Sequence, residues 1–193
     1  MANFIDEFMK NYGPEVTRQM SSNLNVDQGT VAKILPQLAP LILGGLKRQK
    51  DDQGGDARVD HILNKYGDSS VLNNIKDLIA SKVNDSSADA NLGGLLGQGG
   101  GVMAAQTLSK KLNVDSSIIQ RMIPALAPLI LGALTKKRDT SSSGIGGIGS
   151  LLDADGDGSI IDDVAGYLLK SGTASGTKGK GILGSLLGGI LRR

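Results

Sequence analysis

One segment of this 193-residue chain occurs twice. The sequence LNVDQGTVAKILPQLAPLILGGLKRQK at residues 24–50 returns as LNVDSSIIQRMIPALAPLILGALTKKR at residues 112–138, and 13 of the 27 paired positions are identical. A duplication of this length indicates two copies of one supersecondary unit, in which each copy cannot bury its apolar face alone. The feature therefore predicts two related halves that share a core.

The duplication extends beyond this segment. Residues 62–79 pair with residues 151–168 at a shift of 89 residues, one more than the shift of 88 that relates the proline-containing segments. We therefore predict a first helical repeat at residues 1–87, a second helical repeat at 88–170, and a Gly-rich linker with a C-terminal amphipathic helix at 171–193.

The composition indicates an aliphatic core and an unremarkable surface charge. The chain has no Cys, which excludes disulfides and thiolate chemistry, and only 3% of its residues are aromatic. Its 21 Lys and Arg residues nearly balance 19 Asp and Glu residues, so the net charge of +2 does not favour a polyanionic partner. The N-terminal residues lack a signal-peptide pattern, and apolar tracts such as LAPLILGGL have about half of the ~20 residues that a spanning helix needs. We expect a cytoplasmic protein.

Helix signals recur through both repeats. Apolar residues at positions 4, 5, 8, 9 and 12 predict a helix over residues 2–12 that Gly13 ends, and Pro14 opens a second helix that runs to about Asn23. Asp27 and its counterpart Asp115 stand where a helix N-cap is expected. The LGGLLG stretch aligns with the N-terminal helix, so that Leu92 pairs with Phe4 and Leu96 with Phe8.

Two prolines four residues apart interrupt the central segment of each repeat. They are Pro36 and Pro40 in the first repeat and Pro124 and Pro128 in the second. Because a proline inside a helix costs roughly 3 kcal/mol, we expect a break or sharp kink, with one short helix ending near Leu35 and another running through Leu46.

The residues after the prolines predict close packing and then a loop. Gly44 and Gly45, which pair with Gly132 and Ala133, indicate a close approach of the backbone to a neighbouring element. A polar loop is expected at residues 51–56. Each repeat then ends in an amphipathic helix, at residues 70–83 and 159–170 respectively.

An acidic segment in the second repeat resembles a calcium loop. Aspartates occupy positions 1, 3 and 5 of the pattern and Gly158 position 6, but position 12 is Val164, where a bidentate acid is expected. The candidate ligands for a calcium ion are Asp153, Asp155, Asp157, Asp162 and Asp163. The equivalent segment of the first repeat, NKYGDSSVLNN, lacks this carboxylate series, so a solvated acidic turn that begins a helix is the favoured alternative.

The C-terminal segment GILGSLLGGILRR places six aliphatic residues on one helix face. Gly181, Ser185 and Gly189 recur every four residues, a spacing that lets helices approach closely. Gly costs up to about 1 kcal/mol relative to Ala in a helix, so this segment needs a surface to hold a helix. We favour docking on protein, in the same chain or another copy, over contact with a membrane surface.

No grouping of reactive side chains is evident. His61 is the only histidine, and no Ser-His-Asp arrangement can be read around it, so we expect it on a helix surface and predict no enzyme. Basic clusters at residues 47–50, 110–111 and 136–138 permit contact with phosphates. Such clusters also suit helix C-termini, where positive charge interacts favourably with the helix dipole, so nucleic-acid binding is not favoured.

Two motifs together resemble a known family. They are the Pro-x-Leu-Ala-Pro-Leu-Ile-Leu-Gly-x-Leu unit that begins at Pro36 and again at Pro124, and the LDADGDGSIIDD run from Leu152 to Asp163. The chain is similar, over about residues 5–170, to a bacterial family classified as domain of unknown function 937, related to the YidB-like proteins. The resemblance implies a multihelical bacterial protein, and it implies no activity, cofactor or catalytic residue.

The sequence thus predicts an all-α fold with a tandem duplication, in which the two proline-containing helices pack together across a pseudo-twofold axis. The leading hypothesis is a non-enzymatic structural or interaction protein that self-associates through Gly/aliphatic helices, with another copy or another protein as its partner. The alternatives are a calcium-responsive module that uses the Asp153–Asp157 loop and a weak nucleic-acid binder. No small-molecule substrate is evident.

Overall fold

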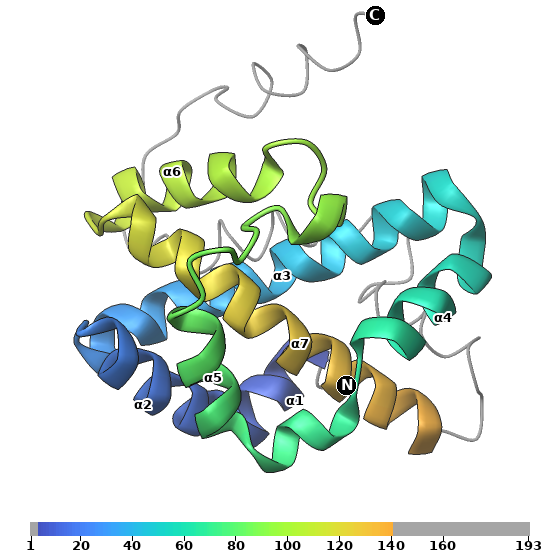
Figure 1. Cartoon of the computed structure of the whole chain (residues 1–193), viewed down its shortest axis with the longest axis horizontal. Coiled ribbons are helices and arrows are strands. Elements are labelled where there is room, and N and C mark those ends of the chain that lie inside the picture. The colour runs from blue at the N-terminus through green and yellow to red at the C-terminus, as the bar shows by residue number, and fades with distance from the viewer. Residues whose placement is uncertain (1–3, 141–193) are drawn as a thin grey trace, which may run out of the picture.

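The structure is a computed structural model that describes residues 4–140, shown in Figure 1. Within this range the chain forms α-helices and short 3-10 helices (η) without strands, so the protein is all-α, as predicted. In chain order the elements are α1 (Phe4–Asn11), α2 (Gly13–Leu24), α3 (Gln28–Gln53), α4 (Gly55–Tyr66), η1 (Ser69–Asn73), α5 (Ile75–Val83), η2 (Leu92–Gly94), α6 (Gly100–Leu112) and α7 (Ser116–Thr140).

The two repeats begin their central helices in the same way. The Asp27 carboxylate accepts a hydrogen bond of 2.8 Å from the backbone N–H of Thr30, which satisfies a donor that has no partner within the helix. Asp115 accepts an equivalent bond of 2.8 Å from the backbone N–H of Ser117 at the start of α7. Both predicted N-caps are therefore confirmed.

The prediction that the prolines break the central helices is wrong. Helix α3 runs without interruption past Pro36 and Pro40, and α7 runs past Pro124 and Pro128. Each proline costs roughly 3 kcal/mol in a helix, whereas burial of one Leu or Ile side chain contributes about 1.5–3 kcal/mol. Because α3 and α7 each bury many aliphatic side chains, burial along the whole helix outweighs the cost of two prolines.

Two other boundaries differ from the sequence prediction. The polar loop expected at residues 51–56 is a single residue, Gly54, whose φ of 127° favours glycine and turns the chain from α3 into α4. The amphipathic helix expected at residues 70–83 is divided into η1 and α5 by Asn74, whose backbone is not helical. Asp68 begins η1 by accepting a 2.8 Å hydrogen bond from the backbone N–H of Ser70.

Equivalent turns show that the two repeats fold alike. Asn25 ends α2 and Asn113 ends α6, and each has a left-handed backbone with a φ of 53°. The backbone N–H of Asn25 donates to the carbonyl of Ser21, and that of Asn113 donates to the carbonyl of Ser109. The duplication in the sequence is therefore a duplication of local structure in this part of the chain.

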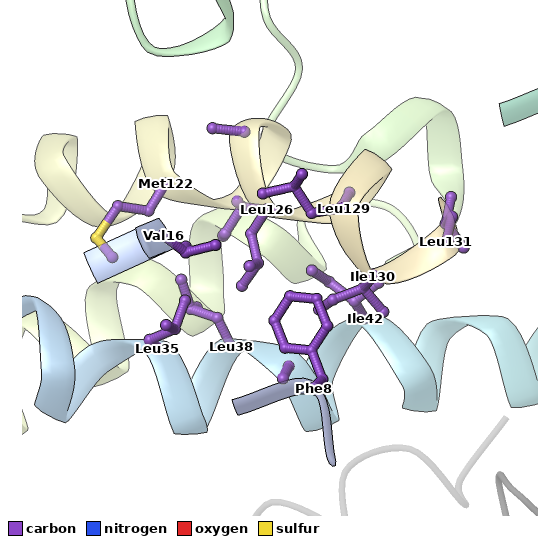
Figure 2. Close-up of a cluster of buried hydrophobic side chains, with 14 of the residues drawn as sticks. Phe8, Val16, Leu35, Leu38, Ile42, Met122, Leu126, Leu129, Ile130 and Leu131 are labelled. Atoms are coloured by element: carbon purple, nitrogen blue, oxygen red, sulfur yellow. The ribbon is translucent and has the colours of Figure 1, made fainter. Parts of the chain in front are cut away.

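Helices α3 and α7 cross at the centre of the molecule and form the middle of one hydrophobic core (Figure 1). Figure 2 shows the contact: Leu38 and Ile42 of α3 face Leu126 and Ile130 of α7, and the ring of Phe8 from α1 fills the space beside them. The predicted packing of the two proline-containing helices against each other is confirmed. The core includes residues of both repeats, because neither repeat can bury its aliphatic face by itself.

The repeats are interleaved rather than placed end to end. The second half of the first repeat, η1 and α5, packs on α7 of the second repeat and on α2. A Cβ atom at Gly132 of α7 would lie 2.7 Å from the carbonyl oxygen of Asp68, so only glycine permits this approach. Gly45 of α3 approaches the carbonyl oxygen of Leu95 equally closely. Close packing at the paired glycines is therefore confirmed at Gly45 and Gly132, whereas a Cβ at Gly44 would meet nothing within 4 Å.

Both central helices are long and apolar enough to cross a membrane by length and composition alone. Their most apolar 18-residue windows have mean hydropathies of 1.3 in α3 and 1.6 in α7. Inside the folded protein, 61% and 78% of these windows are buried. A core helix of a water-soluble protein has the same character, so this finding leaves both environments open.

Candidate interaction cleft

A cleft of about 600 Å³ opens between α4, η2 and the middle of α7. Four apolar residues of α7 form its floor: Pro124, Ala127, Pro128 and Leu131. They are spaced at i, i+3, i+4 and i+7, so they lie on one face of the helix. The prolines that the sequence marks as helix breakers therefore share one face of α7 with Ala127 and Leu131.

The rest of the cleft lining has both apolar and polar side chains. Ile62 and Tyr66 of α4 form one wall, and Leu92 and Leu95 of the η2 region form the other. Tyr66 is 55% exposed, and it is one of two large apolar side chains that are exposed in the range 4–140. An exposed aromatic side chain beside an apolar floor is typical of a binding surface, because burial of an aromatic ring stabilises a complex strongly.

The turn at η2 differs in structure from its counterpart in the first repeat, the α-helix α1. Leu92 pairs in sequence with Phe4 of α1, so a leucine and neighbouring glycines stand where the first repeat has a helix with an aromatic ring. The turn is held by Arg48, whose guanidinium donates a 3.0 Å hydrogen bond to the carbonyl of Leu95. The counterpart of Arg48 is Lys136, which reaches the hydroxyl of Tyr12 beside α1.

Polar groups line the rim of the cleft and have partners within the protein. The guanidinium of Arg58 donates a 2.9 Å hydrogen bond to the side-chain oxygen of Gln49. The ammonium of Lys65 lies 5.1 Å from the centre of the Tyr66 ring, a cation–π contact. These contacts fix Arg58 and Lys65 in place. Of the α7 residues in the lining, Pro124, Ala127 and Leu131 are buried and Pro128 is half-buried.

The carboxylate of Asp89 on the rim serves the backbone of η2. It accepts hydrogen bonds of 2.8 and 2.9 Å from the backbone N–H groups of Asn91 and Gly93, and these bonds hold the pKa of Asp89 below its ordinary value. A carboxylate in this state is a poor general acid, because it stays ionised.

The family of the chain follows from the comparison of its sequence with known families. Residues 6–138 match the family described as "Bacterial protein of unknown function (DUF937)", and residues 102–192 match it a second time. The chain belongs to the DUF937 family. The second match begins in α6, the counterpart of α2, so the two matches agree with the internal duplication. The finer likeness to the YidB-like proteins stays a prediction, and no curated protein and no solved structure matches the chain.

The calcium ligands predicted from the sequence of this DUF937 protein lie outside the described residues. Asp153, Asp155, Asp157, Asp162 and Asp163 all follow Thr140. Among residues 4–140, no group of three or more His, Cys, Asp or Glu side chains lies close enough to hold a metal ion. The predicted site therefore stays a prediction. The Gly/aliphatic segment at residues 181–193 also lies beyond the described part of the chain.

The structure describes the positions of His61 and of the basic clusters at the ends of α3 and α7. His61 is exposed on α4, the helix-surface position expected for it. In the basic clusters, Lys47 pairs with Asp51 at 3.2 Å, Lys50 pairs with Asp56 at 2.8 Å, and the guanidinium of Arg138 pairs with Asp60 at 3.2 Å. These charges are at the ends of α3 and α7, where the helix dipole favours cations.

Sequence reasoning missed the cleft. The prolines predict a break in the chain locally, whereas burial along the helix holds α7 together. One signal could have found it: Pro124, Ala127, Pro128 and Leu131 follow helical spacing. The exposed Tyr66 gives no signal in the sequence, since its exposure depends on how α4 packs.

Proposed function

We propose that this DUF937 protein is a non-enzymatic interaction protein that self-associates, and that its cleft receives the Gly/aliphatic segment at residues 181–191 of a second copy. The observation that carries this proposal is the apolar cleft on α7, with its i, i+3, i+4, i+7 floor and the exposed Tyr66 at its edge. An amphipathic helix bound in an apolar groove is a recurrent mode of protein recognition.

The chemistry of residues 181–191 suits this cleft. The segment presents aliphatic residues at helical spacing, and its small residues at every fourth position allow close approach to another helix. It carries no charge between Gly181 and Leu191, so the cations of the rim, Arg58, Lys65 and Lys82, do not repel it. Since Gly disfavours an isolated helix in water, the segment gains its structure from the surface that it binds.

We also propose that the protein is cytoplasmic and that α3 and α7 are core helices of a water-soluble fold. The support is that most of their apolar windows is buried against other parts of the same chain, while their ends carry ion-paired charges. Burial within the protein removes the apolar surface that lipid would otherwise cover.

The experiment compares two substitutions of Tyr66 in the full chain. Tyr66→Glu places a charge at the edge of the cleft, and Tyr66→Phe keeps the aromatic ring and adds no charge. Self-association is measured by light scattering over a concentration series, with circular dichroism to verify the helical content. We expect Tyr66→Glu to weaken self-association tenfold or more, since burial of a charge against an apolar partner is unfavourable.

Tyr66→Phe serves as the matched control and should leave the molar mass distribution unchanged, because it keeps the apolar ring. Equal effects of both substitutions, or no effect of Tyr66→Glu, would reject the cleft as the docking site. A monomer at every concentration of the unsubstituted chain would reject self-association itself.

A further inference from the structure

We propose that residues 151–170 dock on α3 and α6 of the same chain, in the way that residues 62–81 dock on α7 and α2. This goes beyond the proposed function, because it concerns a different surface and a contact within one copy. The two segments are counterparts in the duplication at a shift of 89 residues, and only the first lies within the described residues.

The observed half of the pattern consists of specific contacts between the repeats. A Cβ at Gly132 would lie 2.7 Å from the Asp68 carbonyl oxygen, and one at Gly67 would lie 2.9 Å from the Leu131 carbonyl oxygen. At the other end of this interface, the guanidinium of Arg121 donates a 2.9 Å hydrogen bond to the carbonyl of Val83, where α5 ends. These contacts fix the position of η1 and α5 along α7.

The equivalent face of α3 lacks these contacts within the described part of the chain. Gly44 is the counterpart of Gly132, and a Cβ there would meet nothing within 4 Å. Leu41 is half-buried, whereas its counterpart Leu129 is fully buried. The duplication therefore places an occupied interface on α7 and an unoccupied equivalent on α3.

The apolar pattern of the docked segment is retained in its counterpart. Val71, Leu72, Ile75 and Ile79, which are buried or half-buried on η1 and α5, correspond to Ile160, Ile161, Val164 and Leu168. Gly67, which approaches α7 closely, corresponds to Gly156. A segment with the same apolar positions and the same glycine fits an interface of the same geometry.

One difference between the repeats explains the exposed Met103. The pKa of Glu15 on α2 is lowered mainly by a hydrogen bond from Gln19, then by Arg18, with which Glu15 pairs at 2.6 Å, and least by the charge of Lys76 on α5. At the equivalent positions the second repeat has Met103 in place of Glu15 and Ala165 in place of Lys76. Two charged residues are thus replaced by two apolar residues, and the docked segment would cover Met103.

A second difference gives the acidic run of the second repeat a partner. The guanidinium of Arg138 donates a 2.9 Å hydrogen bond to Asn64, and the counterparts of these residues are Lys50 and Asp153. The first repeat thus has a neutral amide, Asn64, where the second repeat has a carboxylate, Asp153. Docking would place Asp153 beside Lys50, where opposite charges attract.

Lys47 supports the same placement. Its counterpart in the second repeat is Thr135, whose hydroxyl oxygen lies 2.4 Å from the position of a Cβ at Gly67. The counterpart of Gly67 is Gly156, and Asp155 and Asp157 flank that glycine. Equivalent docking would therefore place Lys47 close to these two aspartates. The calcium-like aspartates are then explained as ion-pair partners of lysines on α3.

The length of the connection limits how far the proposed docked segment can lie from α7. Residues 141–150 connect the end of α7 with the proposed docked segment, and ten extended residues span about 33–36 Å. Docking within one chain is favoured over docking between copies because the connection holds the segment at high effective concentration near α3.

The first test is the thermal stability of the full chain with Gly44→Ala. Docking of residues 151–170 would bring a backbone carbonyl against this position, as at Gly132, so we expect Tm to fall by about 4 °C or more. If the face is open, alanine favours the helix, and Tm would rise by about 2–4 °C. A rise, or no change, overturns the proposal. The molar mass measured by light scattering should stay unchanged, which separates this result from failure of self-association.

The second test uses the unsubstituted chain and does not depend on how a variant folds. A carbodiimide joins amines to carboxylates in direct contact, and mass spectrometry of an equimolar mixture of ¹⁴N- and ¹⁵N-labelled protein identifies the joined residues. We expect Lys47 or Lys50 linked to Asp153, Asp155 or Asp157 in peptides of a single isotope. Mixed-isotope pairs would place the segment of a second copy on α3, and the absence of these links would mean that the segment does not dock there. Either outcome overturns the proposal.

Discussion

Gly132 of α7 and Asp68 before η1 come from different repeats and lie in backbone contact, with 2.7 Å between the position of a Cβ at Gly132 and the Asp68 carbonyl oxygen. We predict that Gly132→Ala lowers the free energy of unfolding by about 1–3 kcal/mol, because a backbone carbonyl held by η1 cannot move aside cheaply. Urea denaturation followed by circular dichroism measures the effect. Gly100→Ala is the control: its Cβ would lie 3.5 Å from Leu96, an ordinary contact, and a loss as large as that at Gly132 would contradict this explanation.

Two glycines at equivalent positions of the repeats should respond differently to the same substitution. A Cβ at Gly101 would lie 1.8 Å from the carbonyl oxygen of Ala90, whereas one at Gly13 would lie 3.2 Å from the end of the flexible Met9 side chain. We expect Gly101→Ala to cost at least about 2 kcal/mol more than Gly13→Ala, because side chains move aside more easily than backbone. Equal costs, measured by thermal unfolding of both variants, would show that the segment around Ala90 can shift.

Thr135 carries a buried hydroxyl that has no hydrogen-bond partner within residues 4–140. Desolvation of an unpaired hydroxyl costs about 1–3 kcal/mol, so Thr135→Val, which keeps the shape of the side chain, should stabilise the protein by about 1 kcal/mol. Thr135→Ser keeps the hydroxyl and loses a methyl group, and it should destabilise. Chemical denaturation of both variants decides the point, and a destabilising Thr135→Val would indicate that the hydroxyl has a partner.

Acid should destabilise the protein through its turn and cap aspartates. Hydrogen bonds from residues of the same turn stabilise the ionised form of five aspartates and so lower the pKa of each carboxyl group. These aspartates are Asp27, Asp68, Asp85, Asp89 and Asp115. At Asp27 the largest cause is the hydrogen bond from the Thr30 hydroxyl. A pKa that is lower in the folded than in the unfolded state stabilises the fold at pH values above the unfolded pKa, about 3.9, and this stability is lost as the pH falls through the folded pKa.

The expected profile is therefore a Tm that is constant between about pH 7 and 5 and that declines below about pH 4. Asp27→Asn keeps a capping side chain but removes the ionisable group, so its Tm should decline less steeply in acid than that of the unsubstituted chain. Calorimetry at a series of pH values measures both. A Tm that rises on acidification would contradict the assigned direction of the pKa shifts.

Local signals in the sequence predict much of the fold correctly. Three local features depend on neighbouring residues, which a sequence displays directly: the helix at residues 2–12, the start of the next helix within one residue of Pro14, and the N-caps at Asp27 and Asp115. The repeat also predicts the central packing of α3 on α7, because two copies of one apolar segment are most readily buried against each other.

Features that depend on distant parts of the chain could not be predicted in this way. Pro36 and Pro124 indicate a break locally, but burial along the whole of α3 and α7 overrides that preference. The interleaving through Gly132 and Asp68, and the cleft beside Tyr66, depend on which repeat supplies the neighbouring helix. The duplication shows that the two repeats are alike. It does not show that η1 and α5 of the first repeat pack on α7 of the second.

The central claim is self-association through residues 181–191, and its most direct test is the mass of the protein in solution. Sedimentation equilibrium of the full chain over a wide concentration range is compared with that of a chain ending at Lys170, with helical content measured in parallel. We predict reversible association of the full chain and a monomer for the shorter one with its helices intact. A monomeric full chain, or association that persists after removal of residues 171–193, would contradict the claim.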